Sequence, residues 1–225
     1  MKLRFFLLVG GLVWLSSFPV SAGVIPYGVH SDTEVSTVEG EWGWSECFVT
    51  PGHSSGIAIS AILSSCDTGD SLMVAVRRVG SDVFDILGAA SFEVVSAYTV
   101  LPYNIDTLTG NDENGISWYR NGKSWGFTEQ GNTIRQFSAD TNLKDAPYHG
   151  VSDTSYGFVG LSFHARGGLL DAGWAFNNGS FVSVGKEYER VWLTATSASV
   201  PEPGTIFLLA LALVGVGVCR RRVDV

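Results

Sequence analysis

Apolar and polar residues alternate with a period of two along much of the chain between residues 23 and 199. The pattern is clearest at 159–165 and at 170–177, where every second side chain is apolar. Alternation of this kind indicates β-strands with one buried face. The same pattern predicts further strands at 42–49, 56–63, 72–79, 83–87, 92–101, 134–137, 181–184 and 188–195.

Two glycine-containing dipeptides predict hairpins. Asn121-Gly122 separates strands at 116–120 and 123–127, and Asn-Gly supplies the positive φ angles of a two-residue type I′ turn. Gly167-Gly168 separates the strands at 159–165 and 170–177 in the same way. Between residues 23 and 199 no stretch of twelve residues has convincing helical periodicity. The body is therefore predicted to be mainly β, an antiparallel β-sandwich of jelly-roll type, with a closed barrel as the alternative.

Residues 1–22 have the three parts of a secretory signal peptide. Two positive charges precede an uncharged run at 5–15, and small residues close the segment at 20–22. The run is short for a membrane span, and small residues suit a signal peptidase. We therefore predict an N-terminal signal helix, cleavage between Ala22 and Gly23, and export of the remainder. A buried N-terminal helix or an uncleaved anchor is the alternative.

Residues 200–225 contain a proline-flanked motif, an apolar run and a basic end. In order, these are Pro201, Glu202 and Pro203; the fifteen uncharged residues 205–219; and Arg220, Arg221 and Arg222. As a helix, the run extends about 22 Å, against about 30 Å of bilayer hydrocarbon. The prolines keep the joint extended and open to a protease. The arginines hold the last residues in the cytoplasm, which leaves the body outside.

This three-part arrangement resembles the PEP-CTERM sorting signal of exported bacterial proteins. In that family the signal is thought to be recognised by an exosortase, a membrane-embedded, transpeptidase-like cysteine enzyme. The resemblance implies processing near residues 201–203 after transient anchoring in the inner membrane. It also implies release or transfer to the cell surface and association with extracellular polysaccharide. From the residues alone, a plain C-terminal membrane anchor is the alternative.

The body between these segments, residues 23–199, carries 9 Lys+Arg against 20 Asp+Glu, a net charge of −11. Proteins that bind nucleic acid usually present a basic face, so the charge speaks against nucleic acid as a partner. An acidic body also repels anionic surfaces, so a polysaccharide partner is expected to be neutral or bridged by cations. The body contains two cysteines, Cys47 and Cys66, which in an exported chain predict one disulfide.

Trp118, Tyr119 and Trp125 surround the Asn121-Gly122 hairpin. Alternation sends Trp118 and Tyr119 to opposite faces of their strand, which leaves at least one ring free to face outward. Exposed rings stack on sugars while neighbouring polar groups orient the hydroxyls. These three residues are therefore candidates for glycan stacking. Ordinary core packing or cross-strand pairing is the alternative.

The histidines give no catalytic or metal-binding pattern. His30, His53, His149 and His164 lack metal-ligand spacing, and neither Gly-x-Ser-x-Gly nor a phosphate-binding glycine loop occurs. Asp145 and His149 are a possible pair only if a serine meets them in space. We predict no catalytic residues and no metal site here.

Paired carboxylates are the other route to glycan chemistry, because glycosidases place two of them across the scissile bond. Candidate pairs occur at 39 and 41, at 112 and 113, and at 187 and 189. Solvated surface charge explains them better.

One loop has some of the features of a calcium site. Asp112 and Asn114 are hard oxygen ligands, and Gly115 permits a sharp turn. The first ligand of an EF-hand cage would fall on Gly110 and the twelfth on Asn121, so the full cage is missing. No cofactor is expected, and calcium is a minor alternative.

Together these features predict three parts: a signal peptide at 1–22, an exported β-sandwich at 23–199, and a sorting tail at 200–225 with a hydrophobic helix. The predicted function is that of a non-enzymatic surface or extracellular-matrix protein associated with exopolysaccharide. A lectin-like carbohydrate-binding module and a secreted glycan hydrolase are the alternatives.

Overall fold

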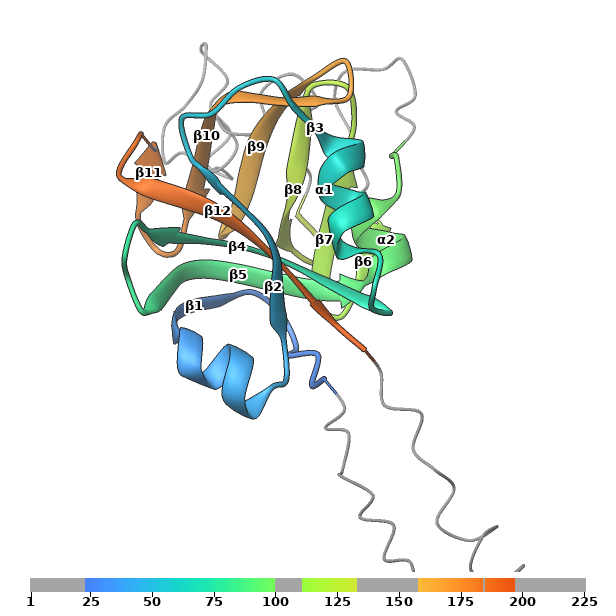
Figure 1. Ribbon diagram of the computed structural model, residues 1–225, viewed down its shortest axis with the longest axis vertical. Helices are drawn as coiled ribbons and strands as arrows, with labels where there is room; N and C mark the ends of the chain where they lie inside the picture. Colours follow the sequence, from blue (N-terminus) through green and yellow to red (C-terminus); the bar gives the residue numbers. More distant parts are fainter. Residues whose placement is uncertain (1–22, 100–110, 133–157, 184, 197–225) are drawn as a thin grey trace, which may run out of the picture.

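The computed structural model describes residues 23–99, 111–132, 158–183 and 185–196. In this part of the chain two antiparallel sheets pack face to face, with short helices at their edges (Figure 1). The prediction of a mainly β sandwich is confirmed.

The first sheet has five strands. Its spatial order is β1 (His30–Glu34), β5 (Val83–Ser91), β4 (Ser71–Arg78), β12 (Tyr188–Ala195) and β2 (Ser45–Pro51). The last strand of the body, β12, therefore lies inside the sheet and pairs with β4 along its whole length. Its predicted bounds, 188–195, are those found.

The second sheet follows the order of the chain from β6 to β11, and each of these strands pairs antiparallel with the next. Its order is β11 (Phe181–Ser183), β10 (Leu169–Asn177), β9 (Gly160–Arg166), β8 (Ser124–Glu129), β7 (Ile116–Arg120) and β6 (Asn111–Glu113), and β3 (Ile57–Ala58) also pairs with β10. The predicted hairpins β7–β8 and β9–β10 are both present. The predicted strand at 134–137 lies outside the described residues.

The five-stranded sheet buries both of its faces. On β4, Leu72, Val74 and Val76 point into the space between the sheets, whereas Met73 and Ala75 point to the opposite side. That opposite side is covered by Val38 and Trp44 and by partly buried neighbours from the segment around the π-helix η1 (Thr37–Glu41). A strand covered on both faces needs a continuous apolar run, which explains why the centre of β4 does not alternate.

Two predicted strands are helical. The segment 56–63 forms β3 and then α1 (Ile59–Cys66), and 92–101 begins with α2 (Phe92–Ser96). In α1 the buried side chains are Ile59, Ile62 and Cys66, spaced by three and four residues. A short apolar run fits both the period of a strand and the period of a helix. Tertiary packing therefore determined that these two segments are helical.

The positive-φ Asn-Gly turn lies at a different dipeptide from the one that the sequence predicted. Asn114 (φ 57°) and Gly115 (φ 75°) form the positive-φ turn that joins β6 to β7. Neither Asn121 nor Gly122 has a positive φ, so the predicted type I′ turn there is wrong. Instead, Asn121 Oδ1 accepts hydrogen bonds from the amides of Lys123 and Ser124 and closes the β7–β8 turn as an Asx-type loop.

Candidate functional site

The two ends of the described body meet beside the last strand. The Gly23 amide donates to the Thr196 carbonyl at 3.3 Å, directly after β12 ends at Ala195. The next residue, Val24, donates to Trp42 O at 2.8 Å and accepts from Trp44 Nε1 at 2.7 Å. We call Gly23, Val24, Trp44, Ala195 and Thr196 the terminal junction. Figure 1 shows both ends of the coloured chain at this end of the body.

Close backbone packing at the terminal junction requires glycine at position 23. A Cβ there would lie 2.4 Å from the Cβ of Ala195, far inside van der Waals contact. Gly69, on the other side of the strand end, is restricted similarly by Thr194 and Ala195. The adjacent Asp70 amide donates to the Ala195 carbonyl at 3.1 Å. The end of β12 is thus fixed by chain segments that are distant in sequence.

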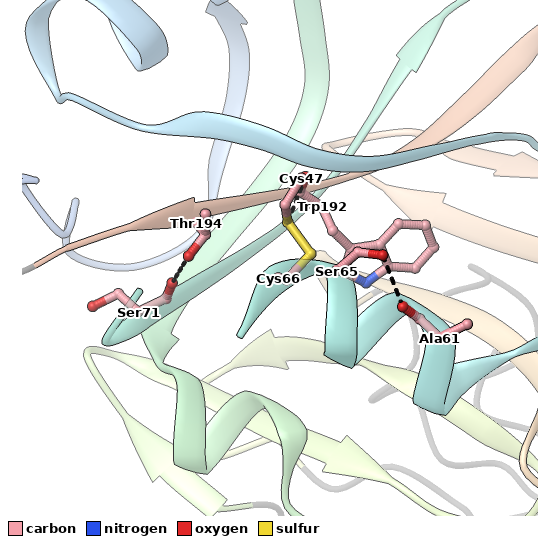
Figure 2. Close-up of a disulfide and its surroundings, with 7 residues drawn as sticks. All are labelled: Cys47, Ala61, Ser65, Cys66, Ser71, Trp192 and Thr194. Carbon is pink, nitrogen blue, oxygen red and sulfur yellow. Dashed lines mark hydrogen bonds between the residues drawn. A yellow bond between two sulfur atoms is a disulfide. The ribbon is translucent and has the colours of Figure 1, made fainter. Parts of the chain in front are cut away.

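A disulfide clamps the strand next to β12. Cys47 on β2 is bonded to Cys66 at the end of α1, with 19 residues of sequence separation. Figure 2 shows this bond beside the Trp192 side chain of β12, and on the same strand Thr194 Oγ1 donates to Ser71 O at 3.3 Å. The strand that leads out of the body is therefore held by β4 on one side and by the stapled β2 on the other.

The residues beyond this junction match a known sorting motif. A family model described as the PEP-CTERM protein-sorting motif matches residues 199–222. The chain carries a PEP-CTERM sorting signal. The matched range includes Pro201, Glu202 and Pro203 together with Arg220, Arg221 and Arg222, all of which lie outside the described residues. No curated protein and no solved structure matches the chain.

The PEP-CTERM signal marks the chain as an exported protein that is processed by an exosortase and is transiently anchored in a membrane. The four residues 197–200 separate Thr196 from the start of the motif at Pro201. Within the described part of the chain, no helix is both long enough and apolar enough to span a bilayer. The signal thus joins the body through a short segment that follows β12 directly.

The aromatic residues proposed to stack on glycans are buried, so that prediction is wrong. Trp118 and Trp125 are 1% and 0% exposed and point into the space between the sheets, where Trp125 packs against Trp192. Tyr119 is 3% exposed on the other face and lies over Gly126, with its hydroxyl donating to Leu161 O at 2.9 Å. Alternation placed Trp118 and Tyr119 on opposite faces correctly, but both faces of the sheet are covered there.

The residues of the calcium hypothesis lie in and beside the β6–β7 hairpin turn. Asn114 Nδ2 donates to the carbonyls of Pro26 and Ala89, and Asp112 accepts from Ser117 Oγ at 2.6 Å. Among the described residues no three His, Cys, Asp or Glu side chains gather closely enough to share a metal ion. The polar groups of the turn thus fasten the N-terminal segment to the sandwich. Calcium binding stays the minor alternative to the expectation of no cofactor.

The candidate carboxylate pairs are divided between structural contacts and solvent. Glu113 accepts from the amide and the hydroxyl of Ser91, at 2.8 and 2.7 Å, just before α2. Glu189 shares Arg77 with Glu46, and these contacts raise the pKa of Arg77 against the opposing effect of its burial. The pair at 39 and 41 is exposed on η1. Glu113 and Glu189 thus make contacts within the fold, whereas Glu39 and Glu41 face solvent.

The three described histidines lie apart in the sequence and the fold. His30 packs edge-on against Trp42, His53 is exposed, and His164 lies under Gly173, whose added Cβ would approach its Nδ1 to 2.6 Å. His149 and Asp145 lie outside the described residues. The structure therefore does not test whether a serine meets these two residues.

One buried charge was missed by the sequence analysis. Arg190, on β12, is fully buried and donates to the backbone carbonyls of Asp171, Pro51 and Ser54, with its guanidinium over Phe163. Burial lowers the pKa of Arg190 to about 10. An arginine within an otherwise apolar period-two strand was the available signal. Arg190 thus links the bulge of β10 to the end of β2 and the loop that follows it.

Proposed function

We propose that the mature protein is a non-enzymatic β-sandwich of the cell surface or extracellular matrix that associates with exopolysaccharide. The observation that carries this proposal is the PEP-CTERM signal at residues 199–222. The folded body supports this proposal only indirectly. The carboxylates first considered for catalysis include Glu113 and Glu189, and both make structural contacts.

The charge of the body narrows the kind of polysaccharide that the protein would meet. With a net charge of −11 over residues 23–199, the body is repelled by polyanions unless cations bridge the two. A neutral polysaccharide, or an acidic one in the presence of divalent cations, is the expected partner class. The surface that makes this contact is not assigned.

The sorting part is tested by following the full chain in producing cells with and without the exosortase. Mature protein from cells with the enzyme is expected to lack both residues 1–22 and the apolar run at 205–219, as measured by intact mass. A variant with Pro201→Ala, Glu202→Ala and Pro203→Ala is expected to stay in the membrane fraction, as it does in cells without the enzyme. A matched control with Glu187→Ala changes one exposed acid in the body and is expected to be processed normally. Retention of the three arginines in mature wild-type protein would contradict the sorting proposal.

The polysaccharide association and the non-enzymatic assignment are tested on purified mature protein. Co-sedimentation with neutral and acidic polysaccharides, with and without calcium, is expected to show binding to the neutral class or binding that depends on the cation. Release of reducing ends from any of these polysaccharides would contradict the non-enzymatic assignment. Absence of co-sedimentation under all conditions would contradict the polysaccharide association.

A further inference from the structure

A largely exposed tyrosine lies beside the turn that joins β7 to β8. Tyr98 comes just after α2 and is 57% exposed. Its neighbour Thr99 is held to the end of β7 by two hydrogen bonds. The Thr99 amide donates to Arg120 O at 2.7 Å, and the Arg120 amide donates to Thr99 Oγ1 at 3.1 Å. The backbone next to Tyr98 is therefore fixed to the sheet, while much of its side chain faces solvent.

The Tyr98 ring lies close to the last residue of β7 and to the turn that follows. The guanidinium carbon of Arg120 is 5.6 Å from the centroid of the ring. At the other end of the ring, a Cβ added to Gly122 would lie 3.3 Å from the Tyr98 hydroxyl. Glycine at position 122 therefore leaves space beside that hydroxyl. The ring is placed by its surroundings without being covered by them.

The guanidinium of Arg120 has no acidic partner among the described residues. The ion pairs found in this part of the chain both involve Arg77. Arg120 Nε is buried and has no hydrogen-bond partner. Burial lowers the pKa of Arg120, and the contribution that opposes this shift comes from Tyr98. Buried donors in folded proteins are nearly always paired, so an unpaired arginine beside an exposed ring points to a group that is supplied from outside.

The residue after Arg120 has a second unused donor. Asn121 is 3% exposed, and its Oδ1 closes the turn by accepting from the amides of Lys123 and Ser124. Its Nδ2 is buried and makes no hydrogen bond to the described residues. Unused donors thus occur at two consecutive residues next to the Tyr98 ring. We call Tyr98, Arg120, Asn121 and Gly122 the Tyr98 platform.

Another exposed tyrosine provides a comparison. Tyr27 is 76% exposed and lies over Gly115 in the β6–β7 turn. There the neighbouring amide of Asn114 already donates to the carbonyls of Pro26 and Ala89. Exposure of a tyrosine is therefore common to both turns, whereas unused donors beside the ring distinguish the Tyr98 platform.

We propose that the Tyr98 platform binds a sugar unit of the exopolysaccharide, with the sugar ring packed on the exposed part of the Tyr98 ring and sugar oxygens accepting from Arg120. This inference rests on the proposed function, because it assigns the surface for the polysaccharide association. The C–H face of a sugar is apolar and packs on an aromatic ring, while polar groups at the edge fix its orientation. The planar guanidinium suits two adjacent hydroxyls or one carboxylate.

The test uses purified mature protein and exopolysaccharide from the producing strain, separated by anion exchange into a neutral and an acidic fraction. Affinity is measured by retardation in native gels that contain increasing amounts of each fraction. The variants are Tyr98→Ala, Tyr98→Phe and Arg120→Gln, with Tyr27→Ala as the matched control. Circular dichroism and urea denaturation check that each variant is folded. Tyr98→Gln replaces Tyr98→Ala should the alanine variant be less stable.

We expect Tyr98→Ala to weaken binding at least about fivefold, because it removes the ring on which the sugar packs. Tyr98→Phe and Tyr27→Ala should bind like the wild type, whereas Arg120→Gln should bind more weakly. The fraction that shows these effects tells whether hydroxyls of neutral units or carboxylates of acidic units accept from Arg120.

Wild-type affinity of Tyr98→Ala for the bound fraction would overturn the inference and leave the polysaccharide association intact. Equal losses for Tyr98→Ala and Tyr27→Ala would also overturn it, since the effect would not belong to the Tyr98 platform. Absence of retardation of the wild type by either fraction would contradict the proposed association itself, and this inference with it.

Discussion

The two sheets of the sandwich differ in what they present outward. The five-stranded sheet is apolar on both faces, because the segment around η1 covers the side away from the core. The seven-stranded sheet directs most of its large aromatic residues inward, and its other face carries Tyr119 together with small or polar residues such as Ser117, Thr128 and Ser162. The strand that leads to the sorting signal belongs to the five-stranded sheet. We infer that the five-stranded sheet contributes most of the free energy of unfolding. Polar contacts on the outer face of the seven-stranded sheet contribute smaller amounts.

The strongest test of this difference is Trp192→Ala, on the inward face of β12. Trp192 is fully buried, and its ring centroid lies within 5.8 Å of those of Phe48, Trp125 and Phe163. Removing an aromatic side chain of this kind costs about 3–5 kcal/mol. Urea denaturation followed by tryptophan fluorescence measures the loss, with Trp192→Phe as the milder control. A loss below about 1 kcal/mol would show that β12 is not central to the core.

The next effect concerns the staple of β2. The variant Cys47→Ser with Cys66→Ser removes a link across 19 residues, which is expected to cost about 3 kcal/mol. Thermal unfolding in the presence and absence of a reductant provides the measurement. Reduced wild type should melt close to the double variant, and a reductant should not change the variant. Equal stability of oxidised wild type and the double variant would contradict a stabilising role.

A smaller effect is expected on the outward face of the seven-stranded sheet. Tyr119→Phe removes the hydroxyl that donates to Leu161 O and is expected to cost about 1 kcal/mol. The matched change Ser162→Ala is expected to be neutral or slightly stabilising, because the buried Ser162 hydroxyl has no hydrogen-bond partner among the described residues. Chemical denaturation resolves both. A loss above about 3 kcal/mol for Ser162→Ala would mean that this face carries more stability than we assign to it.

The smallest effect, of opposite sign, is expected at Asp85 in the five-stranded sheet. Burial raises the pKa of Asp85 above its ordinary 3.8, although Arg78 partly opposes the shift. The folded state therefore favours the protonated form, and this contribution is present below pH 3.8 and lost as the pH rises through the raised pKa. Asp85→Asn should accordingly stabilise the protein at pH 7 by less than about 1 kcal/mol.

Denaturation of Asp85→Asn and wild type at pH 7 and pH 3 checks this sign. The gain should disappear at pH 3, where the wild-type carboxyl is protonated in both states. Asp82→Asn is the matched control, because Asp82 is an exposed acid just before β5. A gain for Asp85→Asn that is larger at pH 3 than at pH 7 would contradict the expected direction.

What the sequence predicted well depends on local patterns. The bounds of strand β12 were predicted correctly from a local run of eight residues, and the sorting signal is a linear series of residues that needs no fold to be recognised. Helix α1 was missed because eight residues are too few to distinguish a helical period from a strand. The type I′ turn predicted at Asn121-Gly122 was wrong, and the positive-φ turn at Asn114-Gly115 was not predicted because it depends on Asn114 reaching Pro26 and Ala89, which are distant in sequence.

The parts that could not be predicted depend on long-range contacts. Arg190 meets carbonyl groups from residues 51, 54 and 171, and Gly23 meets the end of a strand that lies at the other end of the body sequence. Trp118 and Tyr119 were placed on opposite faces, yet the local pattern does not show that both faces are covered. Whether a strand face is buried depends on how the sheets and the segments around them pack in the folded sandwich.

The interior position of β12 has a mechanical consequence. While the tail holds the chain to a membrane or surface, drag on the body is transmitted first to this strand. Because β4 and β2 both run antiparallel along it, a pull from its end loads many ladder hydrogen bonds in shear at the same time. An edge strand would instead peel away from a single neighbour. The tether is thus attached where the sandwich resists tearing from two sides.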